Sequence, residues 1–587
     1  MENIIDDINA LIAEKQFKNA KAILEKNITD SEHNIELLKL RGLCNINLED
    51  YKAAKTDFET VIKYEPDDAT SRFYLANCYD NLEDYIHAIA EYEEVIKLRD
   101  TYLDAYKNLC ITYIKSNEGE KAAQLGIKAL EKHPEEFMLY YIIGTAYMSA
   151  GKFSESIEYL LKANSLNPEY AQVYNNLGTS YMTLGNLDKA REYFLSSLNY
   201  DKDNSITYFN IASIYQVQGD HKEACKYFKQ AYEKEDSDSY LTSWALSEVK
   251  SGDFISAIEH YKILATKYPE KTNFKYNLAT CYEAIGDFKL AADILNQLVM
   301  MNPKAVSLIQ KLAAIYMRMG KLLNAKNMYE KLILQGSVSH EIYYTYAHLC
   351  AKTGDLEKEE KILKKVLDLK SDFAPAHKDL GIIYMRKRLF DYAEDEFKKA
   401  LEVNNKDFNI LYEYANYLHA TTQFEKADEY YQKALEIKPE DPDALGFSAL
   451  NKVQTKDFTT ALKQIEFAIK HAPQNAFMLF IEGKIHFFMK NYEDAKRFLV
   501  RSYEIQQTPD CENMLGLTYF ELEDYKQANN IFLHILKESP VNVTLLLNSA
   551  KCYEKLGEID SALEQLNKLT EIFPECEEAQ EMIRKLS

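Results

Sequence analysis

Small and apolar residues recur along this chain with a period of 34 residues. One series of small residues marks each period: Gly42, Ala76, Cys110, Gly144, Gly178, Ala212, Ala245, Ala279, Ala313, Ala347, Gly381, Ala415, Ala449, Gly483, Gly516 and Ala550. A second series, twelve residues further on, is Ala in 15 of 17 positions: Ala20, Ala54, Ala88, Ala122, Ser156, Ala190, Ala224, Ala257, Ala291, Ala325, Glu359, Ala393, Ala427, Ala461, Ala495, Ala528 and Ala562. Two one-residue deletions, before Ala245 and before Gly516, are the only breaks in phase. Because small side chains let two helix axes approach closely, each period predicts two packed helices.

Turn residues fall at fixed places in the same period. Between the two small positions lie Gly151, Gly185, Gly219, Gly252, Gly286, Gly320, Gly354 and Gly557, and each can end the first helix with a positive φ. Nine of the twelve prolines fall where they would stop the second helix: Pro66, Pro134, Pro168, Pro269, Pro303, Pro439, Pro473, Pro540 and Pro574. The other three, Pro375, Pro442 and Pro509, fall in the first turn of the next period, where proline is tolerated. Each period therefore predicts two helices of about 14 residues, each roughly 21 Å long.

A period such as 171–204, with Tyr174, Leu177, Gly178, Tyr181, Gly185, Ala190 and Phe194, resembles a tetratricopeptide repeat. The resemblance covers 17 units that start near residues 1, 35, 69, 103, 137, 171, 205, 238, 272, 306, 340, 374, 408, 442, 476, 509 and 543. The first unit is degenerate, with Ile8 in place of Gly or Ala. We expect one continuous array over 1–576 and a polar capping segment over 577–587. The resemblance implies an all-α, right-handed superhelical solenoid whose first helices line a concave groove, with the second helices outside.

Composition narrows the class of partner. The formal charge of -22, from 92 acidic and 70 basic residues, disfavours nucleic acid and anionic membranes, since phosphates are held by clustered positive charge. The nine cysteines have neither zinc-ribbon nor redox spacing, which fits a reducing compartment, and Cys44, Cys78, Cys281 and Cys552 share one repeat position as small buried residues. The start of the chain lacks a secretion signal, and the longest apolar stretch, 137–148, is too short to span a bilayer. We expect a soluble, cytoplasmic protein with no membrane insertion; the oligomeric state is left open.

No motif for catalysis appears in the sequence. Phosphate loops, dinucleotide fingerprints, nucleophile elbows and His-Glu-x-x-His are absent, and the twelve histidines are scattered without ligand spacing. The repeats use up the chain, so no stretch of even about 60 residues is left for a catalytic domain. The sequence therefore predicts a protein that is not an enzyme, with no catalytic, cofactor-binding or metal-binding residues.

Two ligand-binding signatures of tetratricopeptide-repeat proteins bear on the expected groove. The clamp that chaperone-binding members use for a C-terminal carboxylate needs Lys, Asn and Arg in three consecutive units, and no three units supply it. Sugar-transferring members carry Asn at the sixth position of many units, where it binds a peptide backbone. A partial version of this pattern is present at Asn108, Asn176, Asn210, Asn277 and Asn548. We take Asn176, Asn210 and Asn277 as candidate peptide contacts; the alternative is a consensus Asn with no ligand.

Odd and even units differ at the positions expected to line the groove. The fifth position of odd units is apolar or aromatic: Ile5, Phe73, Tyr141, Phe209, Tyr276, Tyr344, Tyr412, Phe480 and Leu547. In even units it is Lys39, Lys107, Asn175, Thr242, Gln310, Lys378, Gly446 and Asn513. One helical turn later the preference inverts, with Asn9, Asn77, Thr145, Ser213, Thr280, His348, Asn416, Lys484 and Lys551 in odd units, and Leu43, Ile111, Thr179, Leu246, Ala314, Ile382, Leu450 and Leu517 in even units. Only Thr179 breaks the inversion, so the working unit spans 68 residues.

The alternation has two interpretations, which the sequence leaves open. In the packing interpretation, each odd-unit aromatic leans on the apolar ninth and twelfth residues of its even neighbour. In the binding interpretation, Phe73, Tyr141, Phe209, Tyr276, Tyr344, Tyr412 and Phe480 form stripes in a groove that holds an extended peptide. Both can hold together, because a ring can pack with one face and bind with the other.

These patterns predict a non-enzymatic scaffold that binds an extended segment of one or more partner proteins in its concave groove. The alternative is a non-catalytic substrate-recognition or assembly subunit of a separately encoded enzyme or secretion machine. Both require a protein or peptide partner, which the sequence does not identify.

Overall fold

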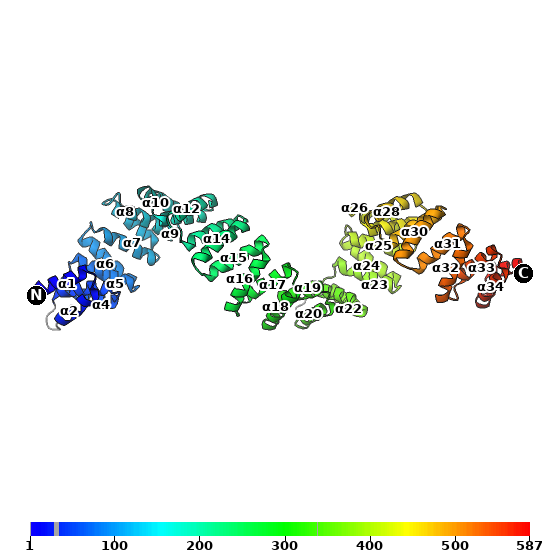
Figure 1. Ribbon diagram of the computed structural model, residues 1–587, viewed down its shortest axis with the longest axis horizontal. Helices are drawn as coiled ribbons and strands as arrows, with labels where there is room; N and C mark the ends of the chain where they lie inside the picture. Colours follow the sequence, from blue (N-terminus) through cyan, green and yellow to red (C-terminus); the bar gives the residue numbers. More distant parts are fainter. Residues whose placement is uncertain (1, 29–33, 337–338) are drawn as a thin grey trace. The chain divides into compact units, whose positions relative to one another are not determined.

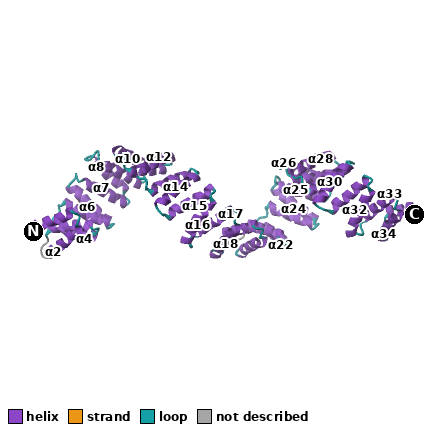
Figure 2. Ribbon diagram, in the orientation of Figure 1, coloured by secondary structure: helices purple, strands orange, loops and turns teal. Residues whose placement is uncertain are grey.

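A computed structural model describes residues 2–28, 34–336 and 339–587, and these residues form 35 α-helices and no strand. Met1, near which the first predicted unit begins, lies outside the described residues. The helices fall into two compact units, Met1–Met300 and Met301–Ser587. Within each unit the helices follow one another as hairpins joined by short loops (Figure 1 and Figure 2). The all-α fold predicted from the period is confirmed.

The helices of the first unit have these bounds: α1 (Glu2–Ala13), α2 (Phe17–Asn27), α3 (Ile35–Asn47), α4 (Tyr51–Tyr64), α5 (Ala69–Asn81), α6 (Tyr85–Leu98), α7 (Leu103–Lys115), α8 (Gly119–Leu130), α9 (Phe137–Ser149), α10 (Phe153–Leu166), α11 (Ala171–Thr183), α12 (Leu187–Tyr200), α13 (Ser205–Val217), α14 (His221–Lys234), α15 (Asp238–Ser251), α16 (Phe254–Lys267), α17 (Thr272–Ala284) and α18 (Phe288–Met301), whose last residue belongs to the second unit.

The helices of the second unit are α19 (Val306–Arg318), α20 (Leu322–Leu334), α21 (His340–Lys352), α22 (Leu356–Leu369), α23 (Ala374–Arg386), α24 (Phe390–Val403), α25 (Phe408–Ala420), α26 (Phe424–Ile437), α27 (Pro442–Gln454), α28 (Phe458–His471), α29 (Ala476–Phe488), α30 (Tyr492–Ile505), α31 (Pro509–Glu521), α32 (Tyr525–Glu538), α33 (Val543–Leu556), α34 (Ile559–Ile572) and α35 (Glu577–Leu586). Odd-numbered helices up to α33 are the first helices of the repeats, and even-numbered helices are the second.

The turn inside each hairpin is set by one residue with positive φ. All eight glycines predicted to end a first helix have φ between 71° and 87°. In the other nine hairpins the same position is held by residues that rarely adopt this conformation, such as Glu83 (φ 62°) and Lys490 (φ 65°). An acidic residue often follows and caps the second helix: the Asp50 carboxylate accepts a hydrogen bond from the backbone N–H of Ala53 at 3.2 Å. The turn is therefore a property of the repeat rather than of glycine alone.

The two small positions bring the helices of a hairpin together. A Cβ added to Gly178 on α11 would lie 2.7 Å from the Phe194 ring on α12, too close for any side chain. Ala190 is fully buried at the same crossing. Phe194 fills the space beside them and is itself fully buried, so the core runs continuously between first and second helices.

The predicted positions of the prolines and of the buried cysteines are borne out locally. Pro375, Pro442 and Pro509 stand in the first turns of α23, α27 and α31. Cys44, Cys78, Cys281 and Cys552 are all buried. The segment 577–587, expected as a polar cap, contains helix α35, whose Ala579 is buried while Met582 and Ile583 pack against the last hydrophobic cluster.

Candidate partner-binding face

First helices contact one another across the repeats. In the first unit α3, α5, α7, α9, α11 and α13 touch in succession, as do α23, α25, α27, α29 and α31 in the second unit. Each of these contacts joins the first helices of two consecutive repeats, so the first helices of neighbouring repeats pack directly against one another. We call the surface made by repeat positions 2, 5, 6 and 9 of these helices the first-helix face.

The predicted aromatics lie on this face and are partly buried by ring contacts. Phe73, Tyr141, Phe209, Tyr344, Tyr412 and Phe480 are partly buried, whereas Tyr276 is 38% exposed. Five of them contact a ring of the next repeat or of the residue just before it, with centroid separations of 5.0 Å for Phe73 and Tyr102, 5.3 Å for Tyr141 and Tyr170, 5.1 Å for Phe209 and Tyr240, 5.0 Å for Tyr344 and Phe373, and 6.0 Å for Tyr412 and Phe447. Each of these pairs joins an odd unit to the even unit that follows.

The candidate asparagines are partly buried, and Asn176 and Asn277 have partners within the protein. The Asn176 amide donates to Thr145 Oγ1 at 3.0 Å, from the sixth position of one repeat to the ninth of the preceding one. Two repeats earlier, the Asn108 amide donates to Asn77 Oδ1 at 2.9 Å, again from a sixth position to the ninth position of the preceding repeat. Asn277 lies beside the buried Tyr261 hydroxyl, where burial raises the pKa of that hydroxyl to about 12. Asn210 is partly buried on α13.

A pocket opens on the first-helix face of the second unit. It encloses about 220 Å³ between α21, α23 and the start of α25, and it is lined by Tyr344, Ala374, Pro375, Lys378, Asn404, Asp407, Asn409 and Ile410. Asp407 caps α25 by accepting hydrogen bonds from the backbone N–H groups of Asn409 (2.8 Å) and Ile410 (3.1 Å). The pocket combines one aromatic wall with an ammonium, two side-chain amides and a carboxylate, a mixture that suits peptide backbone and polar side chains.

Further charged groups lie next to the residues that line this pocket. Asp379 is buried, its Oδ1 lies 2.9 Å from Lys378 Nζ, and its Oδ2 lies 3.4 Å from His348 Nε2. Burial, together with the Asp379 carboxylate nearby, raises the pKa of the Tyr344 hydroxyl. On α25, burial raises the pKa of the Glu413 carboxyl, although the Asn416 amide donates to it at 3.3 Å. The Tyr344 hydroxyl therefore stays protonated, and its hydrogen bond is made to the Asp379 carboxylate.

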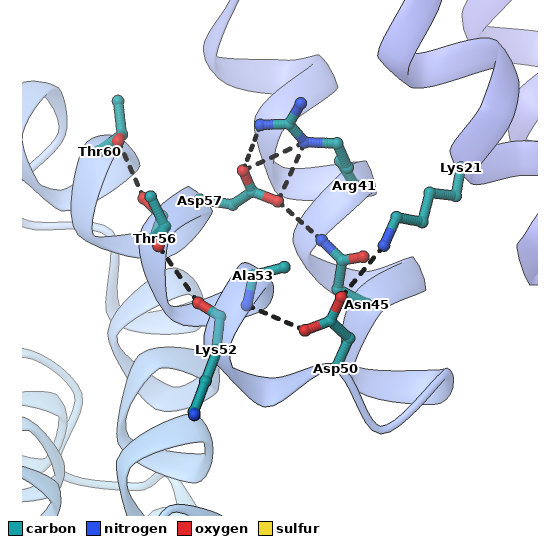
Figure 3. A network of polar contacts seen from close by, with 9 residues as sticks. All are labelled: Lys21, Arg41, Asn45, Asp50, Lys52, Ala53, Thr56, Asp57 and Thr60. Carbon is teal, nitrogen blue, oxygen red and sulfur yellow. Dashed lines mark hydrogen bonds and ion pairs between the residues drawn. The ribbon is translucent and has the colours of Figure 1, made fainter.

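Several polar groups in the core pair with one another. Figure 3 shows the clearest case, in α3 and α4: Arg41 Nε donates to both carboxylate oxygens of Asp57 at 3.1 Å, and the Asn45 amide donates to Asp57 Oδ2 at 3.1 Å. Asp57 is 2% exposed, so this network is internal. Nearby, Lys21 pairs with Asp50 at 3.2 Å. Such internal hydrogen bonds stabilise the hairpin.

The remaining chemical groups of interest are the side chains that ligate metals and the thiols. They contain no group of three or more His, Cys, Asp or Glu placed to hold a metal ion. All nine cysteines are free thiols, and burial raises the pKa of Cys44 to about 11 and of Cys552 to about 12. Thiols with such pKa values are poor nucleophiles. Across the described part of the chain, the helices are too short or too polar to cross a bilayer.

Sequence reasoning missed most of the pocket. It singled out Tyr344 but not Lys378, Asp407 or Asn409, which line the same space. Repeat position is the signal that could have found them: Lys378 occupies the fifth position one unit after Tyr344, and Asn409 the second position one unit after that.

Comparison with known proteins assigns the repeat. Models described as tetratricopeptide repeat match residues 248–315, 519–586, 169–233, 46–102, 340–373 and 408–441, and a model described as TPR repeat matches 144–185. A TPR repeat-containing protein of Methanocaldococcus jannaschii is 23% identical over an alignment of 365 residues, which covers 54% of this chain and 63% of the relative. The BBSome complex member BBS4 of Mus musculus is 23% identical over 319 residues, 54% of this chain and 61% of the relative. The chain thus spans about three fifths of the length of these curated relatives.

Among solved structures, the APC/C hetero-tetramer Cut9–Hcn1 matches with 14% identity and a TM-score of 0.39, covering 94% of this chain and 96% of that one. The matches to repeat models extend from residue 46 to residue 586 and agree with the helix hairpins described above. This chain belongs to the tetratricopeptide-repeat family.

Proposed function

We propose that this chain is a non-enzymatic cytoplasmic scaffold that holds an extended segment of a partner protein against its first-helix face. The observation that carries the proposal is the pocket between α21, α23 and α25, where Tyr344, Lys378 and Asn409 present a ring, an ammonium and an amide to an open space of about 220 Å³. Tetratricopeptide repeats are in general modules for protein–protein interaction, which supports a protein as the occupant. Nine free thiols support a reducing compartment.

A second candidate is a non-catalytic recognition or assembly subunit of a larger machine. One relative supports it, because the BBSome complex member BBS4 carries membership of an assembly in its name and aligns with 54% of this chain. The two candidates share the binding face and differ in the partner, which would be an enzyme or a stable complex in the second case.

Site-specific photocrosslinking in cells tests the proposal. A photoreactive phenylalanine analogue is placed at Asn409, which is exposed in the pocket, and in a control protein at Glu429, which is exposed on the second helix α26 of the same hairpin. We expect discrete polypeptides to crosslink from position 409 and not from position 429. Identical products from both positions, or none from position 409, would refute a partner on the first-helix face. Recovery of an enzyme whose substrate choice changes when this chain is deleted would select the second candidate.

A further inference from the structure

One lysine on the first-helix face lacks a counter-ion. Lys484 holds the ninth position of its repeat on α29 and is partly buried. Its ammonium forms no hydrogen bond or ion pair with any residue that the structure describes, and its nearest aromatic contact is Phe480, whose ring centroid lies 6.0 Å from Nζ. Burial lowers the pKa of Lys484, against the opposite effect of the Asp510 carboxylate. A charge withdrawn from water without a partner costs free energy that an added carboxylate would recover.

The equivalent lysine two repeats later shows what is missing. Lys551 on α33 also holds the ninth position, and its Nζ lies 2.7 Å from Glu578 Oε1 at the second position of the next helix, α35. After Lys484 that second position belongs to Asp510, which is one methylene shorter, is exposed, and forms no ion pair with Lys484 in the described structure. Lys484 therefore differs from Lys551 in having no direct ion pair with an internal carboxylate.

The surface around Lys484 is apolar on both sides. Helices α27, α29 and α31 contact one another in succession. At repeat positions 2, 5, 6 and 9, which share one helix face, they carry the partly buried residues Phe447, Leu450, Phe477, Phe480, Met514 and Leu517. The same positions also carry Asp443, Gly446, Asp510 and Asn513. Phe447 and Phe477 pack with ring centroids 4.8 Å apart, so the apolar surface continues from one repeat to the next. The ammonium thus has large apolar side chains on the helices on both sides of it.

We propose that Lys484 binds an internal Asp or Glu side chain of a partner segment whose flanking residues are large and apolar. A carboxylate there forms a charge-assisted hydrogen bond in a desolvated setting, and its neighbours bury themselves against α27 on one side and α31 on the other. Apolar surface on both sides of Lys484 favours an acidic residue within a chain over a free C-terminus, which would leave one side uncovered. This inference rests on the proposed function and names the chemistry of the bound segment.

Selection from random peptide libraries by the full-length protein tests the inference. One library displays linear peptides internally, with no free C-terminus, and a second displays them with a free C-terminal carboxylate. We expect the internal library to yield peptides with one Asp or Glu between large apolar residues. Affinities of the selected peptide are then measured by fluorescence anisotropy, with its acidic residue intact and replaced by Asn or Gln.

Three substitutions make the measurement specific to Lys484. Lys484→Met and the Gln or Asn peptide should each weaken binding by about tenfold or more, as for a desolvated charge pair that loses one partner. Asp510→Glu should allow an internal ion pair with Lys484, like the pair that Glu578 forms with Lys551. Because this pair would compete with the peptide carboxylate for Lys484, the variant should bind the peptide about threefold more weakly or worse. Lys551→Met is the matched control and should leave the affinity within about twofold.

Three results would overturn the inference: no enriched peptide, enriched peptides without an acidic residue, or equal binding by Lys484→Met. Enrichment only of peptides that need their C-terminal carboxylate would overturn the choice of a side chain as the anion. If Lys484 proves irrelevant while crosslinking from position 409 still recovers discrete partners, the scaffold proposal stands and this inference fails. Loss of specific crosslinking at 409 refutes the scaffold itself.

Discussion

A buried carboxylate on α29 should make the stability of the second unit fall as the pH rises. Glu482 is 4% exposed, and its Oε2 has no hydrogen-bond partner among the described residues. It stands at the seventh repeat position, where the next repeat carries the buried Leu515. Burial raises the pKa of Glu482 to about 7, with Glu466 acting in the same direction and Arg497 opposing it.

The sign and size of the effect follow from linkage. The folded pKa lies above the ordinary value of 4.5, so the folded state binds the proton more tightly than the unfolded state does. The stabilisation from protonation is complete below about pH 4.5 and is lost as the pH rises through about 7. At about 1.36 kcal/mol per pKa unit, the loss between these limits is about 3 kcal/mol. Glu482→Gln has no charge to bury and should be free of this loss.

Local hydrogen exchange of α29 and α30 is the appropriate assay, because repeats of an array need not unfold together. The free energy of opening is compared between the natural protein and Glu482→Gln at about pH 5, 6.5 and 8, with correction for the intrinsic exchange rate. We expect similar values at the lowest pH and an advantage of up to about 3 kcal/mol for the variant at the highest.

A second group titrates nearby and must be separated from Glu482. His486 lies one turn along α29, and burial lowers its pKa, so it removes stability as the pH falls through its folded pKa, opposite in sign to Glu482. Because His486 is present in both proteins, its effect largely cancels from the difference between them. Parallel pH profiles for the natural protein and Glu482→Gln would refute the reasoning, as would a variant that is less stable at high pH.

Further predictions concern packing and the turn. Ala190→Leu should overpack the crossing of α11 and α12, and hydrogen exchange should show a loss of about 1 to 3 kcal/mol confined to neighbouring repeats. Gly320→Ala should lower the free energy of unfolding of its hairpin by about 1 kcal/mol. The cause is backbone strain alone, because φ is 71° and an added Cβ meets nothing within 4 Å. Lys490→Gly, at the same turn position, should raise the free energy of unfolding by roughly 0.5 kcal/mol. Tyr344→Ala should destabilise α21 and α23 by about 2 kcal/mol, since its ring is only partly buried, and should weaken partner binding by about 1 kcal/mol. Gln310→Ala is the control. A Tyr344→Ala protein that melts normally and binds its partner normally would exclude both roles of the ring.

The period of 34 residues was enough to predict the hairpins, because burial and turn geometry repeat with it. Gly151 and the other predicted glycines have the positive φ expected of them, but the same conformation at Glu83 and Lys490 left no mark in the sequence. Those residues adopt it because the hairpin imposes it, and tertiary packing outweighs the preference of one side chain. A residue type signals a turn only where it lowers the cost of that turn.

Contacts on the first-helix face were harder to foresee, for a different reason. Repeat position places Asn176 on that face, but the hydrogen bond to Thr145 depends on which residue stands 31 places earlier. The same is true of Lys484, whose missing counter-ion is evident only beside the Lys551–Glu578 pair. Periodicity fixes the direction of a side chain, whereas its partner is set by the identity and rotamer of a residue in another repeat.

At three junctions between odd and even units, a ring contact takes the place of a helix cap. Some first helices are capped by a side chain, as α5 and α25 are by Asp68 and Asp407, whose carboxylates accept backbone hydrogen bonds. Helices α7, α11 and α23, which open even units, begin after aromatic residues that make no such bond, and each ring contacts the fifth-position ring of the preceding odd unit: Tyr102 with Phe73, Tyr170 with Tyr141 and Phe373 with Tyr344. A lost cap costs about 1 kcal/mol, and an aromatic pair returns about 0.5 to 1.5 kcal/mol beyond the area it buries. Replacing the cap by an aromatic pair therefore leaves the free energy of unfolding nearly unchanged, so these junctions can keep an aromatic surface on the first-helix face. A ring that packs with one side still offers its other side to a partner.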